Sequence, residues 1–230
     1  MHIAIFGANG PTGRLLTSQS LAAGHDVVAL TRHPGAFPLA DPRLRLVGGD
    51  VLDQAAVDGV VEGADAVLST LGTPFTRQPI ELYSRGVGHV LDAMKRFAVR
   101  RVVVVSSSAV TGEDVPGAGV FFNRVLQPYV MKRIGRTTYD DLRRMEALVS
   151  ASEADWTILR PSGLFDLPAV TDYTLTAAHG PGRFTARADL ADAMLRQVAD
   201  DRYLRGVGYL VTTEANPSLL SLMVREAFKK

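Results

Sequence analysis

The sequence predicts an α/β fold: a doubly wound parallel sheet with helices on both faces and a small C-terminal lobe. Three observations predict it. An apolar strand at residues 3–6 runs into a glycine-spaced turn that opens a helix. Apolar runs then alternate with helical periodicity along the chain. One run, Arg101 to Val105, is almost pure valine, which is typical of a strand that is covered on both faces.

The remaining elements follow from periodicity and from the residues that end each run. Gly24 ends the first helix, and Pro161 ends a late strand. Strands are expected at 27–30, 44–47, 66–71, 101–105, 156–160, 173–176 and 208–211, and helices at 11–23, 54–62, 80–98, 138–150, 187–198 and 218–228. A Pro/Gly-rich loop at 112–119, followed by an amphipathic stretch at 121–134, predicts a lid.

Length and composition predict one domain, residues 1–230, with a lid-like insertion at 112–137 and a substrate-side loop at 164–183. The net charge of +1 argues against recruitment of nucleic acid or of an anionic membrane. The chain has no cysteine, and its five histidines are not spaced as ligands, so we expect no metal site. With no signal peptide and no membrane-spanning run, we expect a cytoplasmic protein, a monomer or a weak homodimer.

The N-terminal turn has the architecture of a dinucleotide phosphate cradle. Gly7 turns the chain off the strand, Gly10 admits a pyrophosphate close to bare backbone, and Gly13 lets helix and strand pack tightly. Asn9, Pro11 and Thr12 complete the turn. The helix that begins near Pro11 offers free N–H groups and a positive dipole end to an anion.

The residue that ends the second strand faces the adenosine ribose in this fold, and here Thr31 and Arg32 stand at that point. A guanidinium pairs well with a 2′-phosphate, so Arg32 favours NADP over NAD, with His33 as a further candidate. The alternative is that Arg32 is an ordinary solvated loop cation.

Two further strand ends are candidates for the nucleotide site. Asp50, which precedes Val51, stands where its carboxylate accepts from the adenine amine, or it is the N-cap of the next helix. The segment Leu71, Gly72 and Thr73 closes the fourth strand at the topological switch, where glycine permits backbone approach to the second ribose.

In this order, the motifs resemble one family. They are GANGPTG, Leu30–Arg32, Gly49–Val51, Leu71–Thr73, the VVVVSSS run at Val102–Ser108, Trp156–Pro161, Tyr173–Thr176 and Arg187–Ala191. The chain resembles the atypical short-chain dehydrogenase/reductases of the NAD(P)H-binding, NmrA-like family, most closely the flavin reductase (biliverdin-IXβ reductase) type.

The resemblance implies a Rossmann-like fold with NADP(H) bound along the carboxyl ends of the strands. It places the nicotinamide near Ser106, Ser107 and Ser108, and against Pro161, Ser162, Gly163 and Leu164. It also implies hydride transfer to a small planar, electron-poor acceptor such as a flavin, a quinone or a bilin.

The hydroxyls of Ser107 and Ser108 are candidates to hold a carbonyl oxygen or the carboxamide, or else they satisfy a strand-end turn. Classical relatives use a tyrosine followed four residues later by lysine as acid, and this chain has no such pair. The nearest match is Tyr129 with Arg133, Lys132 lying one residue short, so Tyr129 is either the acid or part of an apolar lid.

The missing tyrosine–lysine pair favours acceptors that take protons from solvent, as flavins and quinones do. Two alternatives stay open: a non-catalytic NADP(H)-responsive regulator of NmrA type, and a carbonyl reductase of a specialised metabolite that uses Tyr129. On the later helices, Arg144 and Glu146 are expected to form a solvated pair, and Asp189 to be an N-cap.

Overall fold

The computed structural model describes residues 1–76, 78–114, 119–120, 122–126, 129 and 135–214. Its central sheet has eight strands in the order β3-β2-β1-β4-β5-β6-β10-β8, all parallel except β8, which runs antiparallel to β10. The strands are β1 (His2–Phe6), β2 (Asp26–Thr31), β3 (Leu44–Gly48), β4 (Ala66–Ser69), β5 (Arg101–Val105), β6 (Asp155–Pro161), β8 (Tyr173–Thr176) and β10 (Gly206–Thr212). The doubly wound fold is confirmed.

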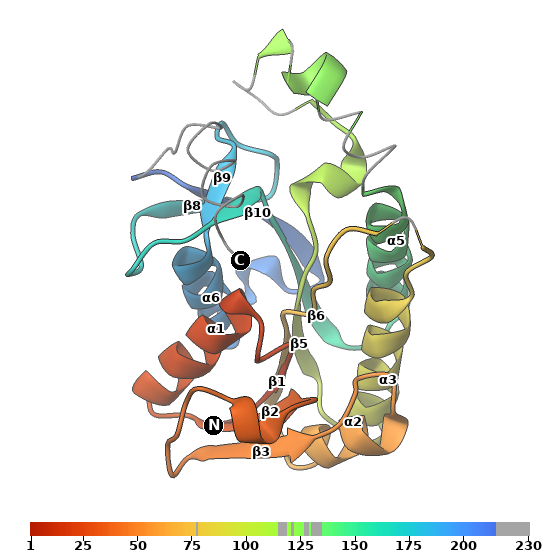
Figure 1. Cartoon of the computed structure of the whole chain (residues 1–230), viewed down its shortest axis with the longest axis vertical. Coiled ribbons are helices and arrows are strands. Elements are labelled where there is room, and N and C mark those ends of the chain that lie inside the picture. Colours follow the sequence, from red (N-terminus) through yellow and green to blue (C-terminus); the bar gives the residue numbers. More distant parts are fainter. Residues whose placement is uncertain (77, 115–118, 121, 127–128, 130–134, 215–230) are drawn as a thin grey trace.

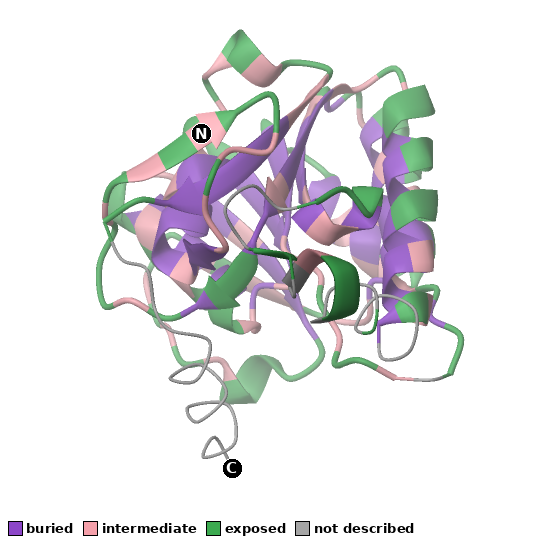
Figure 2. Ribbon diagram, turned by 90° about the horizontal axis from the view of Figure 1, so that it is seen from above, coloured by how far each residue is buried: buried purple, intermediate pink, exposed green. Residues whose placement is uncertain are grey.

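Helices cover both faces of the sheet (Figure 1). On one face lie α1 (Pro11–Ala22) and α6 (Arg187–Arg196), and on the other lie α2 (Gln54–Val61), α3 (Leu82–Arg96) and α5 (Arg136–Ala151). Seen from above, the central strands are buried, and the helices on the sheet expose their outer sides (Figure 2). The edge strands β3 and β8 contain no buried residue. Within the described residues, no helix combines the length and the apolar character that a membrane span requires.

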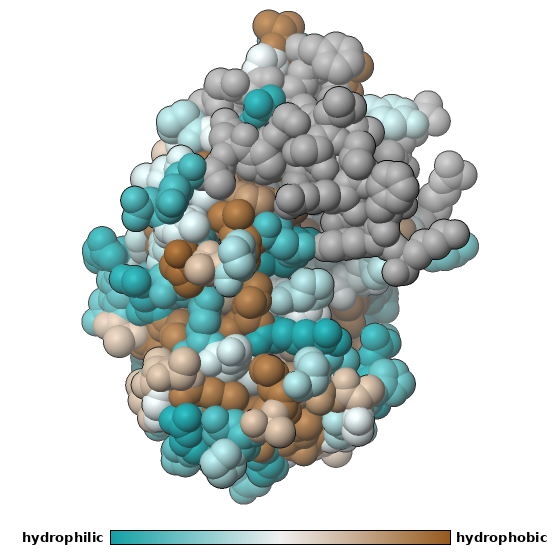
Figure 3. Space-filling model, turned by 60° about the vertical axis from the view of Figure 1, so that its left-hand side comes forward, coloured by the Kyte–Doolittle hydropathy of each residue, from teal (hydrophilic) through white to brown (hydrophobic). Residues whose placement is uncertain are grey.

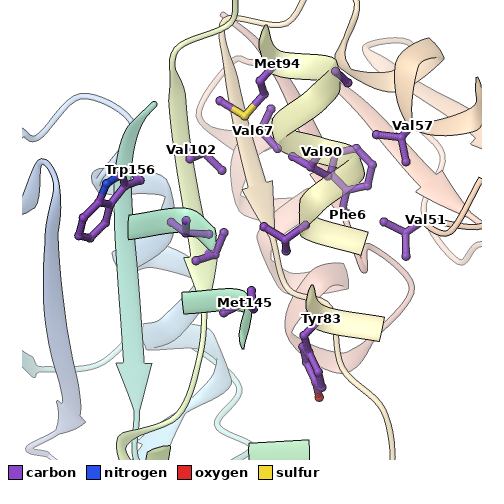
Figure 4. Close-up of a cluster of buried hydrophobic side chains, with 14 of the residues drawn as sticks. Phe6, Val51, Val57, Val67, Tyr83, Val90, Met94, Val102, Met145 and Trp156 are labelled. Carbon is purple, nitrogen blue, oxygen red and sulfur yellow. The ribbon is translucent and has the colours of Figure 1, made fainter. Parts of the chain in front are cut away.

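Alternation along the strands explains how one sequence builds two cores. In β1, Ala4 and Phe6 pack under α2, α3 and α5, whereas Ile3 and Ile5 pack under α1 and α6. In the valine strand β5, Val102 and Val104 belong to the first core and Val103 belongs to the second. The apolar run is unbroken because both faces of this strand are covered. Figure 4 shows the first of these cores, in which Phe6, Met94 and Trp156 lie among valines.

The structure corrects several predicted boundaries. Strand β4 ends at Ser69 rather than Leu71, and α3 begins at Leu82, after Pro79. The loop region contains two further strands, β7 (Gly163–Phe165) and β9 (Phe184–Ala186), which pair in parallel as a separate small sheet. In the amphipathic stretch at 121–134, residues Phe122–Leu126 form a π-helical turn, η3, and most of the others lie outside the described residues, as does the expected helix at 218–228.

The topology sets the position of a ligand crevice. Chain order carries the sheet outward from β1 to β3 and then back to β4, which pairs with the other side of β1. The carboxyl ends of β1 and β4 therefore diverge into connections that leave on opposite faces, which is where doubly wound sheets bind ligands.

Candidate nucleotide site

The turn after β1 has the backbone geometry that its glycines predict. Gly7 adopts a left-handed φ of 76°, and its carbonyl accepts from the N–H of Gly10 at 3.0 Å. A Cβ atom on Gly13 would lie 2.2 Å from the carbonyl oxygen of Gly7. Any side chain at position 13 would therefore force α1 away from β1.

The N-terminus of α1 is free to bind an anion. No side chain caps this helix, Pro11 occupies its first turn, and its first turn contains no acidic residue. The N–H groups of Thr12 and Gly13 have no backbone acceptor within the described residues. Unpaired N–H groups at the positive end of a helix dipole favour a phosphate there.

Arg14 is a cation at this turn that the sequence reasoning missed. Its Nε and a terminal nitrogen both donate to the Oδ1 of Asn9, at 3.1 and 2.8 Å, and its side chain is exposed. The contact fixes Asn9 and adds a positive charge beside the free N–H groups. The available signal was a basic residue directly after the last glycine of the motif.

At the end of β2, Thr31 is buried, and its carbonyl accepts from the N–H of Gly49 at 3.1 Å. Arg32 and His33 follow and are exposed. Arg32 makes no hydrogen bond or ion pair with any described residue. Its guanidinium is therefore available to an anionic group of a ligand.

Asp50, at the end of β3, is not a helix cap. The N-cap of α2 is Asp53, whose carboxylate accepts from the N–H of Ala55 at 3.0 Å. Asp50 instead accepts from the N–H of Leu52 at 2.9 Å through one oxygen. The N-cap alternative for Asp50 is wrong because the helix starts one turn later. Val51, next to it, is buried against α3, where a Cβ on Gly86 would lie 3.0 Å from it.

The segment after β4 is tied to the cradle. The hydroxyl of Thr70 lies 3.2 Å from the carbonyl oxygens of both Phe6 and Gly7. Leu71 is half-buried and Gly72 is exposed, while the N–H of Thr73 donates to the phenol oxygen of Tyr83 at 3.3 Å. The structure thus brings Leu71, Gly72 and Thr73 to the same edge as the glycine turn.

The two segments assigned to the nicotinamide also meet. Ser106 follows β5, and its N–H donates to the carbonyl of Leu159 in β6 at 2.8 Å, close to Pro161, Ser162, Gly163 and Leu164. Ser107 caps the short helix η2 (Ser108–Thr111) by accepting from the N–H of Ala109 at 3.3 Å. Ser108 is buried at the start of η2. Ser107 therefore caps the turn after β5, and this does not prevent the serines from also contacting a ligand.

Buried hydroxyls without partners test whether a nicotinamide nucleotide fits this edge. Ser106, Ser162 and Thr138 are each buried, and within the described residues their hydroxyl oxygens have no hydrogen-bond partner. Buried polar groups are normally satisfied, so such atoms indicate a missing partner. Together with the uncapped α1 and the free Arg32, they fit a ligand with phosphates at one end and a polar ring substituent at the other.

Tyr139 on α5 is the second residue that the sequence reasoning missed. Its side chain is buried, and the hydroxyl of Ser107 lies beside its phenol. Burial raises the pKa of the Tyr139 phenol, the neighbouring Tyr83 adds to the increase, and the interaction with Ser107 opposes it. The available signal was Arg143, four residues later, the same spacing as Tyr129 and Arg133.

Arg143 does not activate this phenol. Its Nε donates to the carbonyl of Val110 at 2.9 Å, and a terminal nitrogen donates to Asp140 at 2.8 Å. The guanidinium is therefore engaged with η2 and with its own helix. Tyr139 is a neutral hydrogen-bonding phenol with a raised pKa.

Asp141 positions the helix that carries Tyr139. This buried carboxylate accepts from the N–H of Tyr83 at 2.8 Å and from the hydroxyl of Ser84, both in the first turn of α3. Arg144 also donates to it, at 3.1 Å. Asp141 thus supplies the cap that the N-terminus of α3 lacks on its own chain segment, and it fixes α5 against α3.

Two expectations about charged residues are wrong. Glu146 does not pair with Arg144; it accepts both arms of Arg160, at 3.0 and 2.6 Å, while Arg160 also donates to the phenol of Tyr209 at 2.6 Å. The pair is largely buried between α5 and β6. Helix periodicity shows only neighbours on one helix, so this partner from a strand was not visible in sequence.

Asp189 is not an N-cap of its own helix. It is fully buried and accepts from the N–H of Thr171 at 2.7 Å and from the hydroxyl of Thr212 at 2.5 Å. It ties the segment before β8 to the end of β10. The N-cap position of α6 is occupied by Ala186, whose side chain makes no cap.

Tyr129 is 57% exposed, whereas Lys132 and Arg133 lie outside the described residues. Its role as an acid stays a prediction. The tyrosine that lies beside Ser107 is Tyr139.

Known proteins share this architecture. A short-chain dehydrogenase/reductase of wide type from Veillonella parvula, solved in complex with NADP, superposes with a TM-score of 0.78 at 20% identity, over 95% of this chain and 99% of that chain. ChuY, an anaerobilin reductase from Escherichia coli O157:H7, gives 0.74 at 22% identity, over 95% of this chain and 100% of that chain. At these identities the likeness shows the fold.

Sequence similarity to curated proteins is partial. UDP-glucose 4-epimerase from Lacticaseibacillus casei is 32% identical over 126 residues, which are 49% of this chain and 37% of that enzyme. Across six curated relatives, this chain spans between 12% and 42% of their length. A family model described as NAD(P)H-binding matches residues 7–201, which takes in the cradle, both strand ends and the serines. This chain belongs to the NAD(P)H-binding family.

Proposed function

We propose that this protein is an NADPH-dependent oxidoreductase that reduces a planar, electron-poor acceptor of the flavin, quinone or bilin class. Within the NAD(P)H-binding family we assign it to the flavin reductase type. The proposal treats residues 1–230 as one cytoplasmic domain, a monomer or a weak homodimer, with 112–137 as a lid and 164–183 as the substrate-side loop.

The preference for NADPH rests on Arg32. Its exposed guanidinium has no partner among the described residues, and it follows β2 at the point that faces the adenosine ribose. No carboxylate occupies positions 31–33 to repel a 2′-phosphate. The guanidinium gains a charge-assisted hydrogen bond only with the phosphorylated cofactor.

The raised pKa of the Tyr139 phenol supports the proposed class of acceptor. When bound, the reduced nicotinamide supplies a hydride. The protein must orient the acceptor and allow protonation of the product. General acids work best when their pKa lies near the operating pH, but burial raises the pKa of Tyr139 and Arg143 is held elsewhere. Tyr139 and Ser107 therefore orient a carbonyl or carboxamide, and the acceptor is one whose reduced form takes its proton from water.

A steady-state assay tests the proposal. We expect saturable NADPH oxidation with menadione or FMN, and little or none with an unconjugated ketone. Tight NADPH binding with no turnover of any of these acceptors would refute the reductase assignment.

A second candidate is a non-catalytic, NADP(H)-responsive regulator. Val120, Val125 and Tyr129 are each more than half exposed within the insertion, so each has an apolar side chain available to a protein partner. Tight NADP binding, no turnover and recovery of a defined partner only with the intact insertion would favour this candidate.

A further inference from the structure

Phe75 is a half-exposed aromatic residue at the carboxyl edge of the sheet. It follows the Leu71–Thr73 segment, and 51% of its surface is accessible. A single exposed apolar side chain needs no explanation by itself. On the face shown in Figure 3, apolar side chains gather in small groups between polar ones. The contacts of Phe75 distinguish it.

The ring of Phe75 is held on its inner side. It lies 6.0 Å from the ring of Tyr139, centroid to centroid, with the planes inclined at 47°. A Cβ on Gly135 would lie 3.0 Å from Cε1 of Phe75 and 2.6 Å from Cε2 of Tyr139, so bare backbone packs against both rings. The hydroxyl of Thr137 donates to the carbonyl of Thr76 at 2.8 Å and ties this loop to α5.

The same contacts connect Phe75 to the reacting end of the site. Tyr139, which touches Phe75, also lies beside Ser107, and the neighbouring Ser106 carries a buried hydroxyl without a partner in the described residues. Phe75 is therefore one side chain removed from the group assigned to the nicotinamide.

We propose that the exposed ring of Phe75 is a stacking surface for the acceptor and selects planar conjugated molecules over saturated ones. This inference rests on the proposed function, because the acceptor must lie beside the nicotinamide. An offset or edge-to-face contact with a second ring adds attraction beyond the burial of area, and an electron-poor ring suits an electron-rich phenyl face. A saturated ketone has no ring system to stack, so it gains only the free energy of burying apolar surface.

The residues around Phe75 give this selection a geometric basis. Tyr139 and Ser107 offer polar groups for a carbonyl oxygen, while Phe75 offers an apolar surface for the ring that bears it. A pocket with an apolar wall and a few fixed polar groups is the usual form of a small-molecule site. In this proposal Phe75 determines which acceptor binds, whereas the glycine turn after β1 binds the cofactor.

Equilibrium binding to the protein saturated with NADP⁺ tests the inference without turnover. The probes are menadione and the saturated cyclohexane-1,4-dione. Quinones add to thiols, and this chain has no cysteine to interfere. We expect Phe75→Ala to weaken menadione binding about tenfold, to leave the dione within about twofold, and to leave NADPH affinity unchanged. Phe75→Trp should retain menadione binding.

Leu148→Ala is the matched control. Leu148 is a half-exposed apolar residue on α5, and its truncation should change neither ligand. Equal menadione binding by wild type and Phe75→Ala would overturn the inference, as would a wild type that binds the dione as tightly as menadione. Turnover of menadione by the wild type, measured in parallel, tests the proposed function separately. An active wild type whose menadione affinity is unchanged by Phe75→Ala would overturn the role of Phe75 and leave the reductase assignment standing.

Discussion

Tyr139 on α5 lies beside Ser107, which follows the end of β5. The phenol has a raised pKa because it is buried, and Arg143 is occupied by the carbonyl of Val110. The two side chains therefore present hydroxyls at the edge of the sheet, and the phenol is not prepared as a strong acid.

Tyr139→Phe should accordingly have a modest effect. We expect kcat with menadione to fall by less than about tenfold, whereas loss of a required general acid costs roughly 10²–10⁴. Tyr203→Phe, which removes a phenol bonded to the carbonyl of Leu175, is the control for loss of a hydroxyl elsewhere. A loss of kcat in the larger range for Tyr139→Phe alone would make Tyr139 the acid and favour a carbonyl substrate.

Gly13→Ala should damage both stability and nucleotide binding. The new Cβ would meet the carbonyl of Gly7 at 2.2 Å, and backbone cannot move aside as a side chain can. We expect a loss of about 1–3 kcal/mol in the free energy of unfolding, measured in urea. Gly59→Ala on α2 is the matched control, because nothing lies within 4 Å of its Cβ, and it should gain about 0.5–1 kcal/mol. Equal effects at the two sites would contradict the cradle geometry.

Arg32→Ala should weaken NADPH and spare NADH. Removing a charge-assisted hydrogen bond raises the Kd for NADPH roughly ten- to a hundredfold, and the cofactor without a 2′-phosphate loses nothing. Fluorescence titration with both cofactors measures this, with Arg43→Ala, an exposed arginine paired with Asp41, as the control. Parallel losses for NADPH and NADH would show that Arg32 is not the specificity residue.

Alkaline pH should destabilise the fold through its buried tyrosines. Burial raises the pKa values of Tyr83 and Tyr139 above 10, so the folded state holds protons that the unfolded state releases. This stabilisation is complete below pH 10 and is lost as the pH rises through the raised folded pKa, at up to about 1.4 kcal/mol per pH unit for each tyrosine. Urea unfolding of Tyr139→Phe above pH 10 should show a shallower decline than wild type; identical slopes would mean that the phenol is not shifted.

Two strands have the bounds that the sequence predicts. Arg101–Val105 and Tyr173–Thr176 have the predicted bounds, because an unbroken valine run and a short alternation leave little ambiguity. Strands β7 and β9 have three residues each, too few for any periodicity, and they exist because they pair with each other.

The candidate site was predictable where chemistry follows a strand end. The glycine turn, Arg32, Leu71–Thr73 and Ser106–Ser108 all lie at the carboxyl edge because parallel strands bring their ends together. Partners supplied by other elements were out of reach. Arg160 from β6 meets Glu146, and Thr171 and Thr212 meet Asp189, through tertiary packing that no local pattern records.

Tyr139 is a different case, since its spacing to Arg143 equals that of Tyr129 to Arg133. Only the packing of α5 against α3, which Asp141 of α5 fixes, shows which tyrosine lies beside Ser107.

The face of NADPH from which the acceptor is reduced gives the most direct test of an oriented nicotinamide. NADPH deuterated at C4 on one face or the other is oxidised with menadione, and the NADP⁺ formed is analysed by mass spectrometry. The account predicts enzyme-dependent oxidation in which one epimer loses its deuterium completely and the other retains it. No enzyme-dependent oxidation, or loss from both faces, would contradict it.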